Sequence, residues 1–269
     1  MNLGKLVRLN RLFAHPSGRF CSVAVDHYIG YSDGLPDGLR HMKETLAAVV
    51  PARPSALTMH KGVAESLWPP YAGSVPLIVQ TVIAWPDDRA CEVVATPEEA
   101  IRLGADAVAV AAFLKGPSEA AHIRMIADCV REAARYGLPV ISHAYSRDFT
   151  GKVATVSFKP EDIAWAAHCA VECGADVVKV PYCGDVKAYA QIVADCPVPL
   201  VAAGGPQAKD IEAALGMMVE VVQSGARGAT IGRNIWGTAH MTAAVHAFKA
   251  VILDGKTPKE AMRIAGLKA

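Results

Sequence analysis

The feature that most constrains the fold is a regular alternation of short apolar runs with longer segments of helical composition. The runs are rich in β-branched residues, which is typical of strands that are buried on both faces of a parallel sheet. We expect strands at Phe20 to Val25, Ala56 to His60, Leu77 to Thr81, Ala107 to Ala112, Pro139 to Ser142, Val177 to Pro181, Leu200 to Ala203 and Ala229 to Gly232. The expected helices that follow them are Pro36 to Val50, Gly62 to Leu67, Pro97 to Leu103, Ser118 to Tyr136, Pro160 to Cys173, Asp185 to Ala194, Ala208 to Gln223 and Trp236 to Asp254.

The ends of these helices carry their own signals. Thr96-Pro97-Glu98-Glu99 offers an N-cap, a proline at the first helical position and acidic residues in the first turn. Gly104, Gly137, Gly174 and Gly225 each follow a predicted helix and precede a predicted strand, as expected of glycines that cap a helix in the left-handed conformation. The pattern therefore indicates repeated βα units.

Eight βα units in 269 residues, with no linker rich in glycine, proline or serine, predict a TIM (β/α)8 barrel that forms a single domain over residues 1–269. An open doubly wound sheet is the alternative architecture. A short helix at Pro258 to Ile264 would lie outside the eight units. We expect the amphipathic N-terminal stretch to close the bottom of the barrel or to contact another subunit.

Composition narrows the classes of partner. The net charge of +1 provides no field that would attract nucleic acid or anionic lipid, which leaves small molecules as the expected partners. No apolar run approaches the roughly 18 residues of a membrane span, and the N-terminus lacks the apolar core of a secretory signal. The odd number of seven scattered cysteines indicates reduced thiols. We therefore expect a cytoplasmic protein.

Lys179 is the anomaly in the predicted strands, because it interrupts the apolar run Val177 to Pro181. Burial disfavours the charged form of an amine and lowers its pKa, so a buried lysine can supply the neutral amine that Schiff-base catalysis needs. Alternatively, Lys179 could pair with a buried carboxylate such as Asp26, or extend to the barrel rim.

Other polar residues follow the strands, where TIM barrels place their active sites. Asp26 ends the first strand and is the strongest candidate for a catalytic carboxylate. Tyr145 ends the fifth strand and could transfer protons beside Arg147, or could simply be a rim tyrosine with a hydrogen-bonded hydroxyl.

Two histidines at the first two strand ends, His27 and His60, could instead bind a metal ion together with Asp26. A metal site would leave Lys179 without a role, so we expect neither a metal ion nor a cofactor.

Two glycine turns follow the last two strands. Gly204-Gly205 and Gly232-Arg233 occupy the positions where TIM barrels commonly bind phosphate through backbone N–H groups, and Arg233 can add a charged contact. Tight βα turns would explain the same glycines without a ligand. Because the two turns follow consecutive strands, we favour a phosphate site.

With these residues identified, the sequence resembles the archaeal-type class I fructose-bisphosphate aldolase (DhnA) family, which also holds aminodeoxyheptulosonate synthase and the autoinducer-2 thiolase. The resemblance runs from about Phe20 to Trp236. It rests on VAVDH (23–27), MHKG (59–62), AYSR (144–147), DVVKVPYCGD (176–185), AAGGP (202–206) and GARGATIGRNIW (225–236).

The resemblance implies a metal-independent aldolase that makes or breaks a C–C bond in a phosphorylated ketose. It places the Schiff base on Lys179, acid/base chemistry on Tyr145 and the family's strand-one aspartate at Asp26. Phosphate binding falls on Gly204, Gly205, Gly232 and Arg233. We also expect His27 and Arg147 to bind substrate, and the protein to form a homo-oligomer.

The chain departs from the family pattern beside these residues. Tyr28 stands where the family has a glycine, and Ser146 and Asp148 replace the proline and glycine of Tyr-Pro-Arg-Gly. These changes surround the catalytic residues, so we expect them to alter the substrate more than the mechanism. The alternatives are a transaldolase or synthase of the aminodeoxyheptulosonate type, a thiolase-like enzyme and a noncatalytic barrel that binds sugar phosphates.

Overall fold

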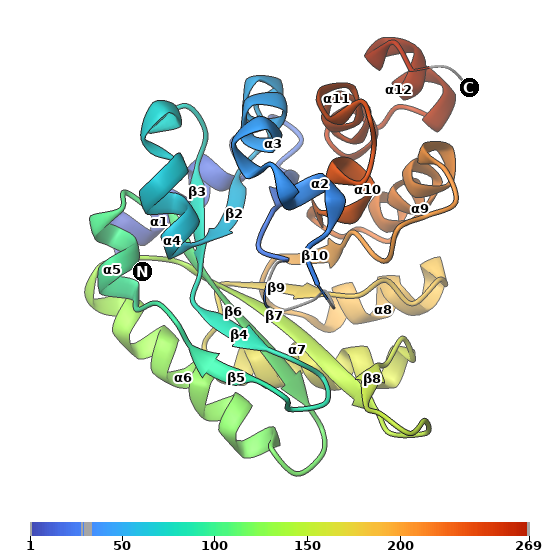
Figure 1. Cartoon of the computed structure of the whole chain (residues 1–269). Helices are drawn as coiled ribbons and strands as arrows, with labels where there is room; N and C mark the ends of the chain where they lie inside the picture. The colour runs from blue at the N-terminus through green and yellow to red at the C-terminus, as the bar shows by residue number, and fades with distance from the viewer. Residues whose placement is uncertain (1, 28, 30–33, 268–269) are drawn as a thin grey trace.

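A closed barrel of eight parallel strands forms the centre of the molecule (Figure 1). The structure is a computed structural model and describes residues 2–27, 29 and 34–267. The barrel strands are β1 (Phe20–Ala24), β2 (Leu57–His60), β3 (Leu77–Gln80), β6 (Ala107–Leu114), β7 (Val140–Asp148), β9 (Val177–Val180), β10 (Leu200–Ala203) and β11 (Gly228–Ile231). Pairing of β6 with β7 closes the ring, so the barrel prediction is confirmed and the open sheet is not.

Helices surround the strands in Figure 1. They are α1 (Leu3–Leu12), α2 (Asp37–Arg40), α3 (Met42–Val49), α4 (Lys61–Leu67), α5 (Pro97–Arg102), α6 (Glu119–Arg135), α7 (Pro160–Glu172), α8 (Val186–Asp195), α9 (Ile211–Gln223), α10 (Arg233–Trp236), α11 (Met241–Ile252) and α12 (Pro258–Ala265), with 3-10 turns at Val50–Ala52 and Pro69–Tyr71. The predicted N-cap is present at Thr96, and it forms a capping box because its side chain and backbone both pair with Glu99. No helix in the described part of the chain is both long and apolar enough to cross a membrane.

Three predicted helix boundaries are wrong, and the simplest is that of α9, which begins at Ile211 rather than Ala208. The first predicted helix is divided into α2 and α3, because His41 adopts a non-helical backbone conformation (φ −110°, ψ 64°). The predicted start of the last long helix at Trp236 is instead the end of α10, a single turn that begins at Arg233 directly after β11. Arg233 is thus fixed on a helical turn rather than in an open loop.

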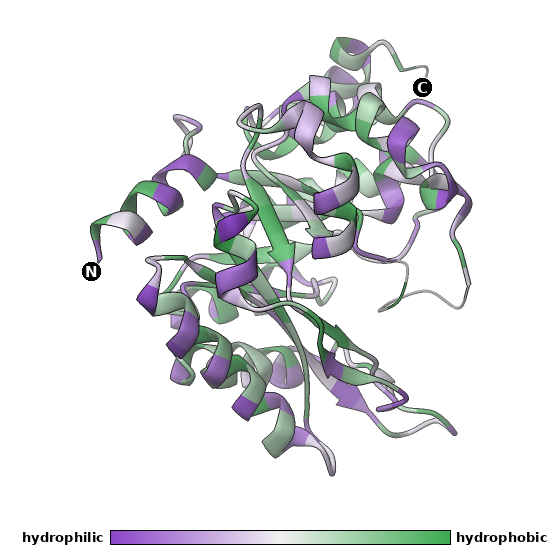
Figure 2. Ribbon diagram, turned by 60° about the vertical axis from the view of Figure 1, so that its left-hand side comes forward, coloured by the Kyte–Doolittle hydropathy of each residue, from purple (hydrophilic) through white to green (hydrophobic). Residues whose placement is uncertain are grey.

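Side chains of the strands alternate between the barrel interior and the helix layer. Figure 2 shows apolar strands at the centre and polar residues on the surrounding helices. At the end where the strands begin, a cluster of Phe20, Ile78, Ile141, Val177 and Val201 fills the interior. Because alternate residues of a strand point to the same side, Lys179, two residues after Val177, also faces the inside of the barrel.

Helix α1 closes the lower end of the barrel, which is one of the two alternatives expected of the amphipathic N-terminus. Leu12 is only 1% exposed and packs into the interior cluster. Salt bridges of 3.0 Å join Lys5 to Asp176 and Arg11 to Asp106, which lie just before strands β9 and β6.

Two antiparallel additions to the barrel were not predicted. Strands β4 (Val82–Ala84) and β5 (Cys91–Val93) form a hairpin directly after β3. Strand β7 continues to Asp148 and pairs there with β8 (Thr155–Val156). The polar sequence after Ser142 looks like a loop, yet its residues are buried because the strand continues along the barrel wall.

Candidate active site

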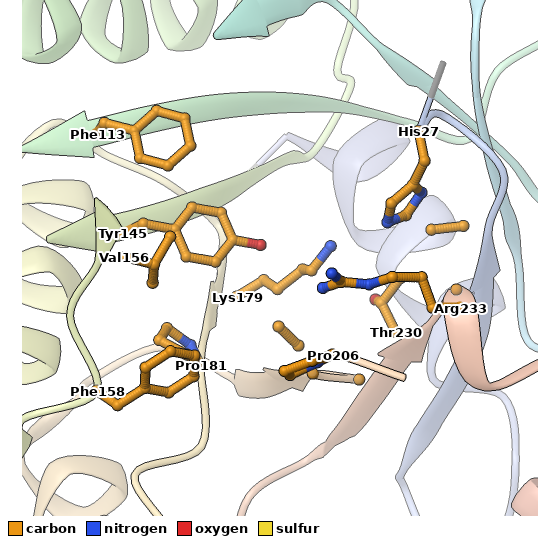
Figure 3. A pocket seen from close by; sticks show the side chains of 15 residues that line it. His27, Phe113, Tyr145, Val156, Phe158, Lys179, Pro181, Pro206, Thr230 and Arg233 are labelled. Carbon is orange, nitrogen blue, oxygen red and sulfur yellow. The ribbon is translucent and has the colours of Figure 1, made fainter. Parts of the chain in front are cut away.

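A cavity of about 230 Å³ opens at the end of the barrel where the strands finish (Figure 3). Its lining residues are Ala24, His27, Phe113, Tyr145, Val156, Phe158, Lys179, Pro181, Ala203, Gly204, Gly205, Pro206, Thr230, Gly232 and Arg233. Seven of the predicted site residues are among them. Asp26 lies close by, whereas Arg147 does not line the cavity.

Lys179 projects from the middle of β9 and is 5% exposed. Burial lowers the pKa of its amine to about 8, while the negative charge of Asp26 opposes this shift and the positive charge of Arg233 adds to it. In Figure 3 the amine of Lys179 and the guanidinium of Arg233 point toward one another. With a pKa of about 8, a minor fraction of this amine is neutral at pH 7, and that fraction increases as the pH rises.

Asp26 is 2% exposed and lies at the end of β1. Burial opposes its ionisation, but the His27 imidazole, 3.3 Å from its Oδ1, and the charge of Lys179 hold the pKa of Asp26 well below its usual range. The amide Nε2 of Gln80 donates to Asp26 Oδ2 at 3.2 Å. Asp26 is therefore a carboxylate at neutral pH.

His143 and Gln80 belong to this network, and the sequence analysis did not select them. The Nδ1 atom of His143 lies 3.4 Å from Lys179 Nζ and 3.3 Å from Gln80 Nε2. Burial and the charge of Lys179 hold the pKa of His143 well below its usual range, so the ring is neutral. Spacing offered a signal for His143, because it lies two residues before Tyr145 and so shares its face of the strand.

Tyr145 extends from β7 with its hydroxyl directed toward Lys179 (Figure 3). Its ring stacks on Phe113, with centroids 5.5 Å apart and an interplanar angle of 24°. Burial raises the pKa of the phenol above its usual value, and the charge of Asp26 adds to the rise. Tyr145 is consequently a protonated phenol that can donate a proton.

The two glycine turns meet at Asn234, which sequence reasoning also missed. Its Nδ2 donates to the carbonyls of Gly204 and Pro206 at 2.9 and 3.0 Å, and its Oδ1 accepts from the Ala208 N–H at 2.8 Å. Asn234 is buried and lies on α10. One side chain thus ties the turn after β10 to the turn after β11.

Two of the predicted glycines have a local reason to be glycine. Gly205 has a φ of +71°, which disfavours any other residue. A Cβ on Gly232 would lie 2.7 Å from Cε1 of His27, so the imidazole could not occupy its position beside the cavity. His27 also packs edge-on against Trp236, with ring centroids 5.4 Å apart.

Arg147 has a different environment from the one expected of a substrate-binding residue. Its buried guanidinium forms a 2.7 Å ion pair with Asp88 and donates to the Lys115 carbonyl at 2.7 Å. It therefore links β7 to the β4–β5 hairpin. The carboxylate of Asp148 accepts from the Thr150 N–H in the same outer region, and Tyr28 lies outside the described residues.

The alternative of a metal site finds no support in the described residues, since no group of three or more His, Cys, Asp or Glu side chains is arranged to hold an ion. His60 ends β2 and is the register partner of Gln80 on β3. Burial lowers the pKa of His60, against the charge of Asp26, so this ring is neutral as well.

Comparison with known proteins gives consistent results. The sequence profile of DeoC/LacD family aldolases matches residues 20–238. The chain is 30% identical, over 98% of its length and 95% of the relative's, to a 2-amino-4,5-dihydroxy-6-oxo-7-(phosphonooxy)heptanoate synthase of Streptomyces griseus. It is 31% identical to a class 1 fructose-bisphosphate aldolase of Thermoproteus tenax, over 77% of this chain and 78% of that protein.

Solved structures agree with these sequence matches. An archaeal fructose 1,6-bisphosphate aldolase superposes with a TM-score of 0.82 at 29% identity, covering 94% of this chain and all of that one. Another archaeal aldolase structure, with its catalytic lysine covalently bound to the carbinolamine intermediate of the substrate, gives a TM-score of 0.81 at 28% identity, again over 94% of this chain and all of that one.

Proposed function

The chain belongs to the DeoC/LacD family of aldolases, and we propose that Lys179 is the residue that binds a phosphorylated ketose as a Schiff base. The enzyme is a class I aldolase, which cleaves or forms a C–C bond through an imine. The observation that carries the assignment of Lys179 is a buried amine, with a pKa of about 8, on the wall of a cavity that also holds a phenol and two glycine turns.

The proposed reaction begins with the neutral amine of Lys179, which attacks the ketose carbonyl and forms an iminium ion with loss of water. The iminium is the electron sink for cleavage of the C3–C4 bond, so the mechanism requires neither a metal ion nor a cofactor. In this step the C4 hydroxyl passes its proton to the Asp26 carboxylate, the C3–C4 bond breaks, and an enamine and a free aldehyde result. Tyr145, a protonated phenol directed toward Lys179, protonates the enamine carbon, and the Asp26 carboxylate stabilises the nearby iminium charge.

The substrate phosphate is proposed to bind between the glycine turns. Gly204, Gly205 and Gly232 allow the backbone to approach an anion closely, and Arg233 brings a guanidinium to the same side of the cavity. A phosphate held there would place the substrate carbonyl over Lys179. His27, on the same wall, is available to contact a substrate hydroxyl.

Trapping with borohydride tests the assignment of Lys179. Dihydroxyacetone phosphate and borohydride should leave a reduced adduct on Lys179, located by peptide mass spectrometry, and Lys179→Ala should leave none. The exposed Lys187 provides a matched control, because Lys187→Ala should be modified like the unaltered enzyme. An unmodified Lys179, or loss of activity on treatment with a chelator, would contradict the proposal.

A synthase that joins two fragments through the same imine is the second candidate. The match to two named synthases, from Streptomyces griseus and Halobacterium salinarum, over 98% of the chain favours it. A synthase should cleave ketose phosphates slowly and turn over faster when an acceptor aldehyde is added. A noncatalytic barrel would instead show no turnover. Sugar phosphate would raise its thermal stability, and it would do so equally in Lys179→Ala.

We further propose that the protein forms a homo-oligomer, which follows from the family resemblance alone, and that it acts in the cytoplasm, which its free cysteines support. Light scattering on the purified chain would give the number of subunits.

A further inference from the structure

The orientation of the Gln80 amide is fixed by its neighbours. Its Oε1 accepts from the backbone N–H of Val82 at 3.4 Å, and its Nε2 faces the Asp26 carboxylate at 3.2 Å. Reversing the amide would place two acceptors against each other at Asp26 and two donors against each other at Val82. Gln80 therefore presents an N–H group to His143.

This N–H group fixes the tautomer of His143. A neutral imidazole has one nitrogen that donates and one that accepts. Because Gln80 Nε2 donates toward Nδ1 at 3.3 Å, Nδ1 is the accepting nitrogen and the proton resides on Nε2. The same Nδ1 atom lies 3.4 Å from Lys179 Nζ, so Gln80 and Lys179 share its one lone pair as acceptor.

The barrel has room for this arrangement because the strand between β3 and β7 is lined with alanine. Ala109 of β6 is paired in register with Gln80, and Ala111 with His143. Their small side chains let Gln80 and His143 meet across β6. His143 is in turn the register partner of Lys179 on the neighbouring strand β9.

We propose that His143 is a positioning residue for the nucleophile: its Nδ1 accepts a hydrogen bond from the Lys179 amine and so directs the amine's lone pair toward the cavity. A neutral amine that donates one N–H to His143 keeps its lone pair free for the substrate carbonyl. The opposite tautomer would donate to that lone pair and block it. His143 remains neutral and transfers no proton in this role, which rests on the proposed function of Lys179.

The test is the limiting rate of imine formation at high pH, where the amine is fully neutral, so that orientation is separated from ionisation. The measurement is single-turnover trapping of dihydroxyacetone phosphate by borohydride. His143→Phe keeps a ring but removes the acceptor, and should lower this limiting rate roughly 100-fold while the affinity for the ketone phosphate changes little. His143→Asn places an oxygen near the position of Nδ1 and should recover about tenfold of the loss.

Several outcomes would overturn the inference. His143→Phe could trap substrate at the unaltered rate, or His143→Asn could be no faster than His143→Phe. Nitrogen-15 spectra of the unaltered protein give a measurement that does not depend on folding of a variant: Nδ1 of His143 should be unprotonated and Nε2 protonated from pH 6 to 9, and the reverse tautomer would refute the role. If the unaltered enzyme forms no adduct on Lys179, the proposed function fails instead.

Discussion

Lys179 lies between two charges of opposite sign, and each moves its pKa in a different direction. The Asp26 carboxylate raises the pKa of the amine, and the Arg233 guanidinium lowers it. Burial, which is the largest influence, lowers the pKa to about 8. Since the neutral amine is the nucleophile, the fraction that can react rises as the pH increases through this value.

The rate of imine trapping should therefore increase with pH around a midpoint near 8. Asp26→Asn removes the charge that raises the pKa, so its midpoint should fall by about one unit. Arg233→Gln removes a charge that lowers the pKa, so its midpoint should rise by a similar amount. The midpoint of the pH profile at saturating ketone phosphate is the measurement, because it does not depend on the amplitude of the rate. Movement of both midpoints in one direction would contradict this arrangement of charges.

The sequence allowed prediction of those site residues whose chemistry is unusual for their position. A lysine within an apolar strand and an aspartate at the end of another stand out without a structure, and the charges of Lys179 and Asp26 do interact in the folded barrel. His143 and Gln80 did not stand out, because their role depends on contacts across β6 that only the strand register creates. Arg147 was expected at the substrate from its place after the fifth strand and from the family motif, whereas the carboxylate that pairs with it, Asp88, lies on a hairpin that was not predicted.

At the level of the elements, the turns after β10 and β11 act as one unit because Asn234, which lies on the turn after β11, is hydrogen-bonded to the turn after β10. Its three hydrogen bonds reach Gly204, Pro206 and Ala208. The backbone groups proposed to bind phosphate are thus held by a side chain that itself does not line the cavity.

Asn234→Ala should separate the two turns and weaken the binding of phosphorylated ligands. We expect KM for a ketose phosphate to rise more than tenfold, kcat to fall less, and stability to decrease by about 1–3 kcal/mol because buried carbonyls lose their partners. Steady-state kinetics and chemical denaturation provide the measurements. Thr238→Ala, which removes a local hydrogen bond to Ile235 at the end of the same segment, is the control. Equal effects of the two substitutions on KM would argue against the role of Asn234.

Strands could be predicted from the sequence where both of their faces are apolar. All eight barrel strands were found from apolar runs because residues facing the barrel interior and residues facing the helices are both hydrophobic over most of each strand. The second half of β7 was missed because there the interior face changes to His143, Tyr145 and Arg147. The polar residues that form the site thus remove the apolar pattern from which this part of the strand could have been predicted.

For the whole molecule, the two ends of the barrel differ, since one is closed by apolar packing and the other carries the candidate site. Helix α1 packs at the end where the strands begin, and the site lies where they finish. Because the two ends are separate, substitutions in the lower cluster should change the stability of the protein without changing the chemistry of Lys179.

Leu12→Ala tests that separation. Leu12 is buried in the lower cluster, so its truncation should lower the free energy of unfolding by about 2–5 kcal/mol. Leu6→Ala on the same helix, where the side chain is 41% exposed, should change it by less than about 0.5 kcal/mol. Denaturant titration gives both values, and kcat per folded molecule should match that of the unaltered enzyme in each variant. A large loss of kcat in folded Leu12→Ala would show that the two ends are coupled.

The closure of one end by α1 also determines how substrate enters the enzyme and how products leave it. With the lower end filled by Leu12 and the interior cluster, the water released on imine formation and both halves of a cleaved sugar must depart through the mouth by which the sugar arrived. The ketone half remains covalently attached to Lys179 until the imine is hydrolysed, so the aldehyde leaves first. A barrel with a single opening and a covalent intermediate thus releases its two products in a fixed order.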